Sequence, residues 1–101
     1  MKKENETEQS VDIELLAKEG KTPEKGKKYK IKVDQEKFDV DVECMTGAEI
    51  LNLAGKTPPE RFQLNAKIHG KVEKVEQNQT ICFTTPGLEK FMTIPLDQTE
   101  G

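Results

Sequence analysis

The chain has 101 residues and a formal net charge of −3, from 16 basic and 19 acidic side chains. It is long enough for one small domain, and its near balance of charges argues against a dedicated binder of nucleic acid or anionic membranes, which would usually carry a basic patch. Charged residues make up 35% of the chain and apolar residues 33%, so we expect part of it to lie outside the folded core.

Residues 1–27 differ in composition from the rest and predict a flexible N-terminal arm. The opening MKKENETEQS has no apolar stretch after its lysines, so it is not a secretory signal. No segment is apolar over the length needed to span a membrane, and we expect a cytoplasmic protein. Within the arm, VDIELL alternates only briefly and fits either one helical turn or a short extended strand.

Two strands follow the arm, over residues 28–33 and 37–43. Each alternates between apolar and charged side chains, the pattern of a strand with one face in water. Only a short turn separates them, which predicts an antiparallel hairpin. Lysines of the first strand then meet acidic residues of the second, and such pairs contribute about 0.2–1 kcal/mol each. The expected inward side chains are Tyr29, Ile31, Val33, Phe38, Val40 and Val42.

The period then changes, and MTGAEILNLAG predicts a helix over residues 46–54. Thr46 and Glu49 fit a capping box, and Gly55 fits the left-handed residue that ends a helix. Because so short a helix needs packing to persist, we expect it to lie across the sheet. Its expected core stripe is Ile50, Leu53 and Ala54, with Leu51 at the margin, packed on Ile31, Val33, Val40, Val42, Leu64 and Phe91.

The remaining chain predicts three more strands. RFQLNAKI alternates again, TICF is a short apolar strand, and LEKFMTIPL fits the final strand. KVEKVEQNQ fits a short edge strand or a loop. Strands with a single helix predict an α+β domain of about 70 residues.

The stretch GKTPPERFQL resembles the glycine, double proline, acidic residue and strand that follow the helix in ubiquitin. LNLAGKTPPERFQL together with PGLEKFMTIP resembles the prokaryotic ubiquitin-like domains called multiubiquitin domains. The resemblance covers residues 28–95 and implies a ubiquitin-like β-grasp, a mixed sheet of four to five strands with one helix packed across it. The implied organisation is an arm over 1–27, this domain over 28–95, and a flexible tail over 96–101.

The resemblance also implies a protein modifier rather than an enzyme. An activating enzyme, supplying ATP and magnesium, would adenylate the C-terminal carboxylate of Gly101. A conjugating enzyme would receive it as a thioester, and a target protein would receive it on an amine. A zinc isopeptidase of the deubiquitinase type would be a further partner. The free chain would be a monomer that binds no cofactor, metal, nucleic acid or membrane.

The ending LDQTEG suits this use, because glycine lacks a Cβ and hinders a narrow channel least. Pro95 lacks an N–H donor and tends to end strand pairing, which would release the tail. Ubiquitin and the bacterial sulfur carriers end in two glycines, whereas this chain ends in Glu100 and Gly101, so its partners would have to accept a single glycine. The tail residues that partner enzymes would contact are Leu96, Asp97, Gln98, Thr99 and Glu100.

Other side chains allow further hypotheses. Ala66, Ile68 and His69 form a candidate partner-binding patch, although Ile68 fits the core equally well. Cys44 and Cys82 lack the spacing of a disulfide framework or a zinc site, and we expect two reduced thiols, one or both buried. A catalytic cysteine would need a histidine positioned as its base. The single histidine, His69, lies in a predicted surface turn, which argues against a Cys–His nucleophile.

Two alternative functions remain open. A sulfur carrier would use the same fold and the same adenylated terminus, and would end as a thiocarboxylate. A ubiquitin-like interaction module would dock to partners without conjugation and would not need Gly101. The acidic VDIELL segment also resembles the short motifs that add a strand to the edge of a ubiquitin-like domain.

Overall fold

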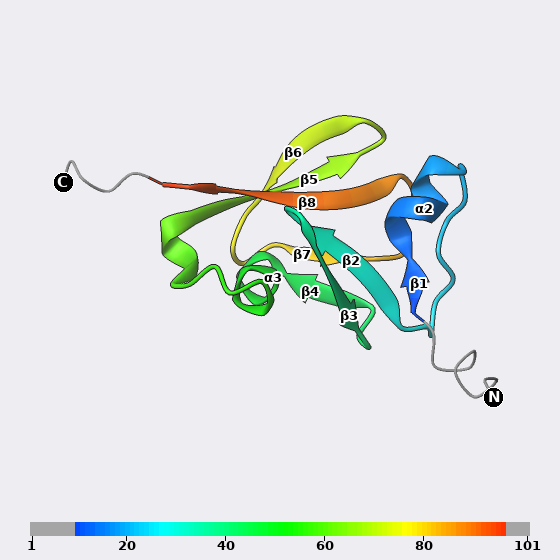
Figure 1. The fold of residues 1–101 in the computed structure, drawn as a ribbon, viewed down its shortest axis with the longest axis horizontal. Helices are drawn as coiled ribbons and strands as arrows, with labels where there is room; N and C mark the ends of the chain where they lie inside the picture. Colours follow the sequence, from blue (N-terminus) through cyan, green and yellow to red (C-terminus); the bar gives the residue numbers. More distant parts are fainter. Residues whose placement is uncertain (1–9, 97–101) are drawn as a thin grey trace.

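A computed structural model describes residues 10–96 of the chain, which form one main sheet, one small sheet and two α-helices (Figure 1). In chain order, the elements are β1 (Val11–Asp12), α2 (Ile13–Lys18), β2 (Tyr29–Val33), β3 (Glu36–Val40), β4 (Cys44–Thr46), α3 (Gly47–Leu53), the 3-10 turn η1 (Pro59–Arg61), β5 (Phe62–Ile68), β6 (Lys71–Val75), β7 (Thr80–Cys82) and β8 (Leu88–Pro95). Within this part of the chain, no helix could cross a membrane.

The main sheet confirms the predicted β-grasp arrangement. Its neighbours run β3, β2, β8, β5, β6, with the short β1 as a sixth strand beside β2. β2 and β8 are parallel, whereas the β2–β3, β5–β8 and β5–β6 pairs are antiparallel. One helix, α3, connects the first hairpin to the later strands, and its buried residues join the core of the sheet.

The β2–β3 hairpin forms as predicted but is shorter than expected. Lys30 lies opposite Asp39, and the two side chains form a 2.9 Å ion pair. β3 ends at Val40, because its partner β2 begins at Tyr29 and no strand continues beyond that pair. Val42, which was expected in the core, therefore lies beyond the pairing and is 45% exposed.

The α3 helix carries the predicted capping box. The Glu49 N–H donates to Thr46 Oγ1, and the Thr46 N–H donates to Glu49 Oε1 at 2.9 Å. Ile50 is fully buried, as expected. Leu51, expected at the margin, is buried as well, whereas Leu53 and Ala54 pack only partly against the core. The helix is therefore turned relative to the predicted stripe.

The described part of the predicted N-terminal arm, residues 10–27, is packed against the domain and not separate from it. Val11 and Asp12 pair in parallel with β2, and α2 follows directly. Asp12 caps this helix, since its carboxylate accepts from the Glu14 and Leu15 N–H groups. Ile13 is fully buried. The two structures proposed for VDIELL thus both occur, one after the other. Residues 1–9 lie outside the described residues.

Candidate functional site

The end of β8 is where the chain leaves the sheet, at the opposite end of the molecule from α2 (Figure 1). β8 ends at Pro95, which lies opposite Phe62 of β5. One further backbone hydrogen bond follows, because the Leu96 N–H donates to the Arg61 carbonyl at 2.8 Å. The chain therefore does not leave the domain at Pro95, as was predicted, because Leu96 is still bonded to it. Asp97, Gln98, Thr99, Glu100 and Gly101 lie outside the described residues.

Two aliphatic side chains mark this exit. Ile94 is 48% exposed and Leu96 is 40% exposed. Leu96 also lines a groove of about 170 Å³ between the start of β5 and the end of β6. Exposed aliphatic side chains beside a groove are typical of surfaces that contact partners. The sequence contained a signal for Ile94, because Phe91 faces inward and strand alternation turns the side chain three residues later outward.

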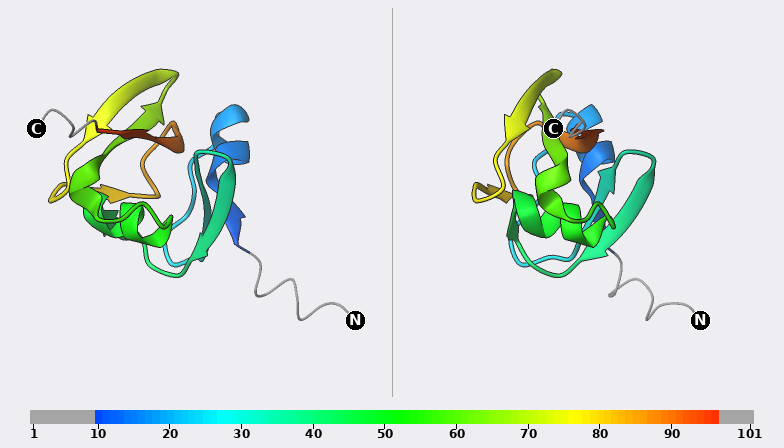
Figure 2. Two further views of the ribbon diagram at one scale, coloured as in Figure 1. Left: turned by 60° about the vertical axis from the view of Figure 1, so that its left-hand side comes forward. Right: turned by 90° about the vertical axis from the view of Figure 1, so that its left-hand side faces the viewer.

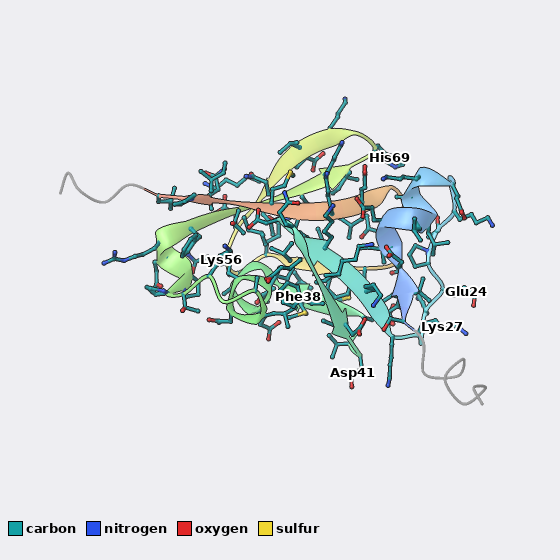
Figure 3. All side chains as sticks on the ribbon, viewed as in Figure 1. Glu24, Lys27, Phe38, Asp41, Lys56 and His69 are labelled. Carbon is teal, nitrogen blue, oxygen red and sulfur yellow. A yellow bond between two sulfur atoms is a disulfide. The ribbon has the colours of Figure 1, made fainter. Side chains whose placement is uncertain are left out.

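The predicted patch of Ala66, Ile68 and His69 is not a single exposed surface. Ala66 is fully buried, and Ile68 packs partly against the core. His69 is exposed in the β5–β6 turn, and its N–H donates to the Gly87 carbonyl. Figure 3 places His69 near α2, far from Lys56, whose ammonium lies 5.9 Å above the Phe62 ring. A partner that contacts His69 thus approaches the end of β5 opposite the exit.

The other face of β5 is polar at its centre. Its outward residue Asn65 lies between Lys74 of β6 and Met92 of β8. Asn65 is buried there, and its Oδ1 accepts a 3.0 Å hydrogen bond from Gln63 Nε2. Gln63 in turn lies opposite Ile94. This face therefore combines polar groups with two exposed aliphatic side chains, Ile94 near the exit and Val72 opposite Lys67 at the other end of β5.

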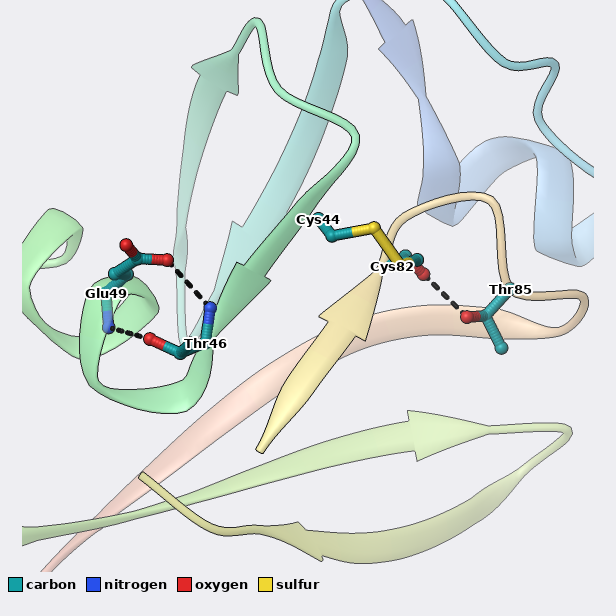
Figure 4. Close-up of a disulfide and its surroundings, with 5 residues drawn as sticks. All are labelled: Cys44, Thr46, Glu49, Cys82 and Thr85. Carbon is teal, nitrogen blue, oxygen red and sulfur yellow. Dashed lines mark hydrogen bonds between the residues drawn. A yellow bond between two sulfur atoms is a disulfide. The ribbon is translucent and has the colours of Figure 1, made fainter. Parts of the chain in front are cut away.

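Cys44 and Cys82, which were expected to be reduced thiols, instead form a disulfide (Figure 4). They lie directly opposite each other in a small antiparallel sheet of β4 and β7. The disulfide could not be predicted from the sequence, because 38 positions separate the two cysteines. No local pattern indicates that the two short strands pair with each other. The Thr85 hydroxyl donates to the Cys82 carbonyl and closes the following turn. No group of three or more His, Cys, Asp or Glu side chains that could hold a metal ion occurs within residues 10–96.

We predict that the disulfide stabilises the domain. A link between residues 38 positions apart restricts the unfolded chain, and such links typically contribute about 2–4 kcal/mol. The Cys44→Ser, Cys82→Ser double variant should lose this amount of unfolding free energy in urea titrations followed by circular dichroism. Reductant should destabilise the wild-type chain and leave the double variant unchanged. A wild-type chain indifferent to reductant would show that the two thiols are not joined.

The comparison with known families agrees with this geometry. A family model described as multiubiquitin matches residues 29–95. The match begins at the first residue of β2 and ends at the last residue of β8, so the N-terminal segment lies outside it. No curated protein and no solved structure matches the chain.

Proposed function

The chain belongs to the multiubiquitin family, and from this premise we propose that it is a protein modifier joined to its targets through the carboxyl group of Gly101. The observation that carries the proposal is the position of the exit. The family domain ends with β8, and residues 96–101 follow it. Beyond Leu96, which is still bonded to the domain, five residues in an extended chain would reach about 17 Å, enough to carry a terminal carboxylate into an active site on another protein.

The proposed chemistry uses only that carboxylate from this chain. It attacks the α-phosphate of ATP in the activating enzyme, which forms an acyl-adenylate and releases pyrophosphate. A cysteine thiolate then displaces AMP and forms a thioester, which is passed to the conjugating enzyme. Attack by an amine of the target forms the amide and frees the thiol. ATP and magnesium belong to the activating enzyme. A zinc isopeptidase hydrolyses the finished amide with water, which frees the target amine and the Gly101 carboxylate.

The surface around the exit supports this role. Ile94 and Leu96 offer exposed aliphatic contacts to an enzyme that holds the tail. The polar and acidic side chains of residues 97–100 would be the next groups that such an enzyme contacts. A chain that continued beyond Gly101 would need cleavage after this glycine before activation.

We place this cycle in the cytoplasm, which supplies the ATP. Persistent disulfides are rare there, and Cys44 and Cys82 are only half-buried. The Cys44–Cys82 disulfide would then be one of these rare cases.

The test is to isolate an N-terminally tagged chain from its native host and identify its covalent state by mass spectrometry. A modifier gives higher-mass species in which a tail peptide ending at Gly101 is linked to an amine of another protein. A sulfur carrier instead gives a free chain with sulfur in place of one carboxyl oxygen. A non-conjugated interaction module gives only the unmodified chain, with partners that detach in denaturant. Either of the last two results would overturn the modifier proposal.

A further inference from the structure

The N-terminal segment fills a gap between two strands of the main sheet. β3 pairs with β2 along its whole length, so it takes one edge of that strand. β8 meets the other edge only at Val33, opposite Phe91. Along the first half of this edge, Val11 and Asp12 pair with Tyr29 and Lys30 instead. Figure 1 shows β1 beside β2, and α2 beside the start of β8.

One apolar side chain anchors the segment. Ile13 is fully buried in the same core cluster as Tyr29 and Phe91, which belong to the two strands that diverge. The next apolar residue, Leu15, is 54% exposed. A single deep aliphatic anchor beside a short paired strand is the arrangement by which extended peptides add to a sheet edge. Figure 2 shows this segment, in blue, beside the β2–β3 hairpin.

Carboxylates on both sides of the anchor meet two lysines of the hairpin. Asp12 Oδ2 lies 2.7 Å from Lys37 Nζ. Glu14 lies 3.7 Å from the same ammonium and 3.7 Å from Lys32 Nζ, and its side chain is 9% exposed. Lys18 of α2 also contacts Glu14, at 3.9 Å. Burial acts to raise the pKa of Asp12, but the hydrogen bond from Lys37 and those from the α2 backbone outweigh it, and the pKa is lowered.

The segment is thus bound in the manner of a ligand. It lies outside the matched family domain, and the turn that connects it to β2 is exposed over most of residues 19–28. We propose that the cleft between the diverging ends of β2 and β8 is a peptide-binding site that residues 11–14 occupy in cis. Its partner in trans is a protein that presents an aliphatic–Asp–Ile–Glu segment, extended over the first two residues and helical from the isoleucine onward, as in this chain. This site lies beyond the proposed conjugation chemistry and does not depend on it.

The cis segment competes with such a partner and so determines how tightly the partner must bind to displace it. A short tether gives an attached ligand an effective concentration on the order of millimolar, so a free peptide competes poorly with it. Substituting Ile13 by aspartate places a charge where the anchor is buried, and should release the segment while β2 and β8 keep their own residues. The cleft then becomes available in the full-length chain.

The experiment measures binding of a fluorescent peptide with the sequence of residues 10–20 to full-length variants. Ile13→Asp should bind it at least roughly tenfold more tightly than the wild-type chain, because the cis competitor is gone. Adding Lys32→Glu and Lys37→Glu should remove this gain, and a peptide carrying Glu14→Lys should bind neither protein. Leu15→Asp is the matched control, because this exposed residue lies on the same helix, and it should behave as wild type.

Glu14→Lys in the full chain provides a second test that leaves the Ile13 anchor unchanged, and it too should bind the wild-type peptide more tightly than the wild-type chain does. The proposal is overturned if neither Ile13→Asp nor Glu14→Lys gains peptide binding, or if both lose cooperative thermal unfolding, since the segment is then an integral strand of the core. It is also overturned if light scattering shows that the released variants dimerise at the peptide concentrations used, which would assign the cleft to a second copy of the chain.

Discussion

Replacing Ile50 by alanine should lower the free energy of unfolding by roughly 2–5 kcal/mol. Ile50 is fully buried on α3 within the main core cluster, so the truncation removes apolar contacts and leaves a cavity. Alanine is the better helix former, but that gain is only a few tenths of a kcal/mol and cannot offset the cavity. Because small domains are marginally stable, a loss of this size could unfold the protein at 37 °C.

The measurement is urea unfolding followed by circular dichroism, since the chain has no tryptophan. Ile94→Ala is the matched control, because it removes the same atoms from a side chain that is 48% exposed. Surface substitutions usually change stability by no more than about 0.5 kcal/mol. Equal losses in the two variants would mean that α3 does not pack on the sheet through Ile50.

Local signals explain why much of the fold was predictable from the sequence. The capping box of Thr46 and Glu49 depends on residues three positions apart, and it forms with both hydrogen bonds. Strand alternation likewise predicted the inward positions of β2 and the meeting of its lysines with acidic residues of β3, which holds for Lys30 and Asp39 but not for Lys32, which lies opposite Lys37. These features depend on neighbours in the sequence and short turns, which a single chain displays directly.

Contacts between distant segments explain most of the misses. The burial of Ile13 requires a gap between β2 and β8, and the Cys44–Cys82 link requires two three-residue strands to align. Neither has a local periodic signal. Ala66, which was wrongly predicted to be part of an exposed patch, did have a local signal of burial. Strand alternation puts it on the same face as Leu64, and both side chains are buried. Its small size made it a poor candidate for an exposed patch and a good one for close packing under a helix.

Removing Gly101 should abolish formation of the thioester with the activating enzyme. The adenylation step needs an unhindered terminal carboxylate, and glycine alone offers one without a Cβ. Gly101→Val should lose nearly all activity for the same reason. Neither change should alter the melting temperature, since every buried residue of the described core precedes Leu96. The measurement is a non-reducing gel of the purified chain with its activating enzyme, ATP and magnesium.

Glu100→Gly is the matched control, because it changes the tail next to the reacting residue and keeps the terminal glycine. If the partner reads only an unhindered end, this variant forms the thiol-sensitive adduct at least as well as the wild-type chain. If the partner instead requires the carboxylate of Glu100, the variant loses the adduct although its terminal glycine is intact. The activating enzyme would then recognise Glu100 in addition to using the carboxyl group of Gly101. An adduct that forms equally well without Gly101 would show that its carboxyl group is not the conjugating group, and the proposed function would fail at its central residue.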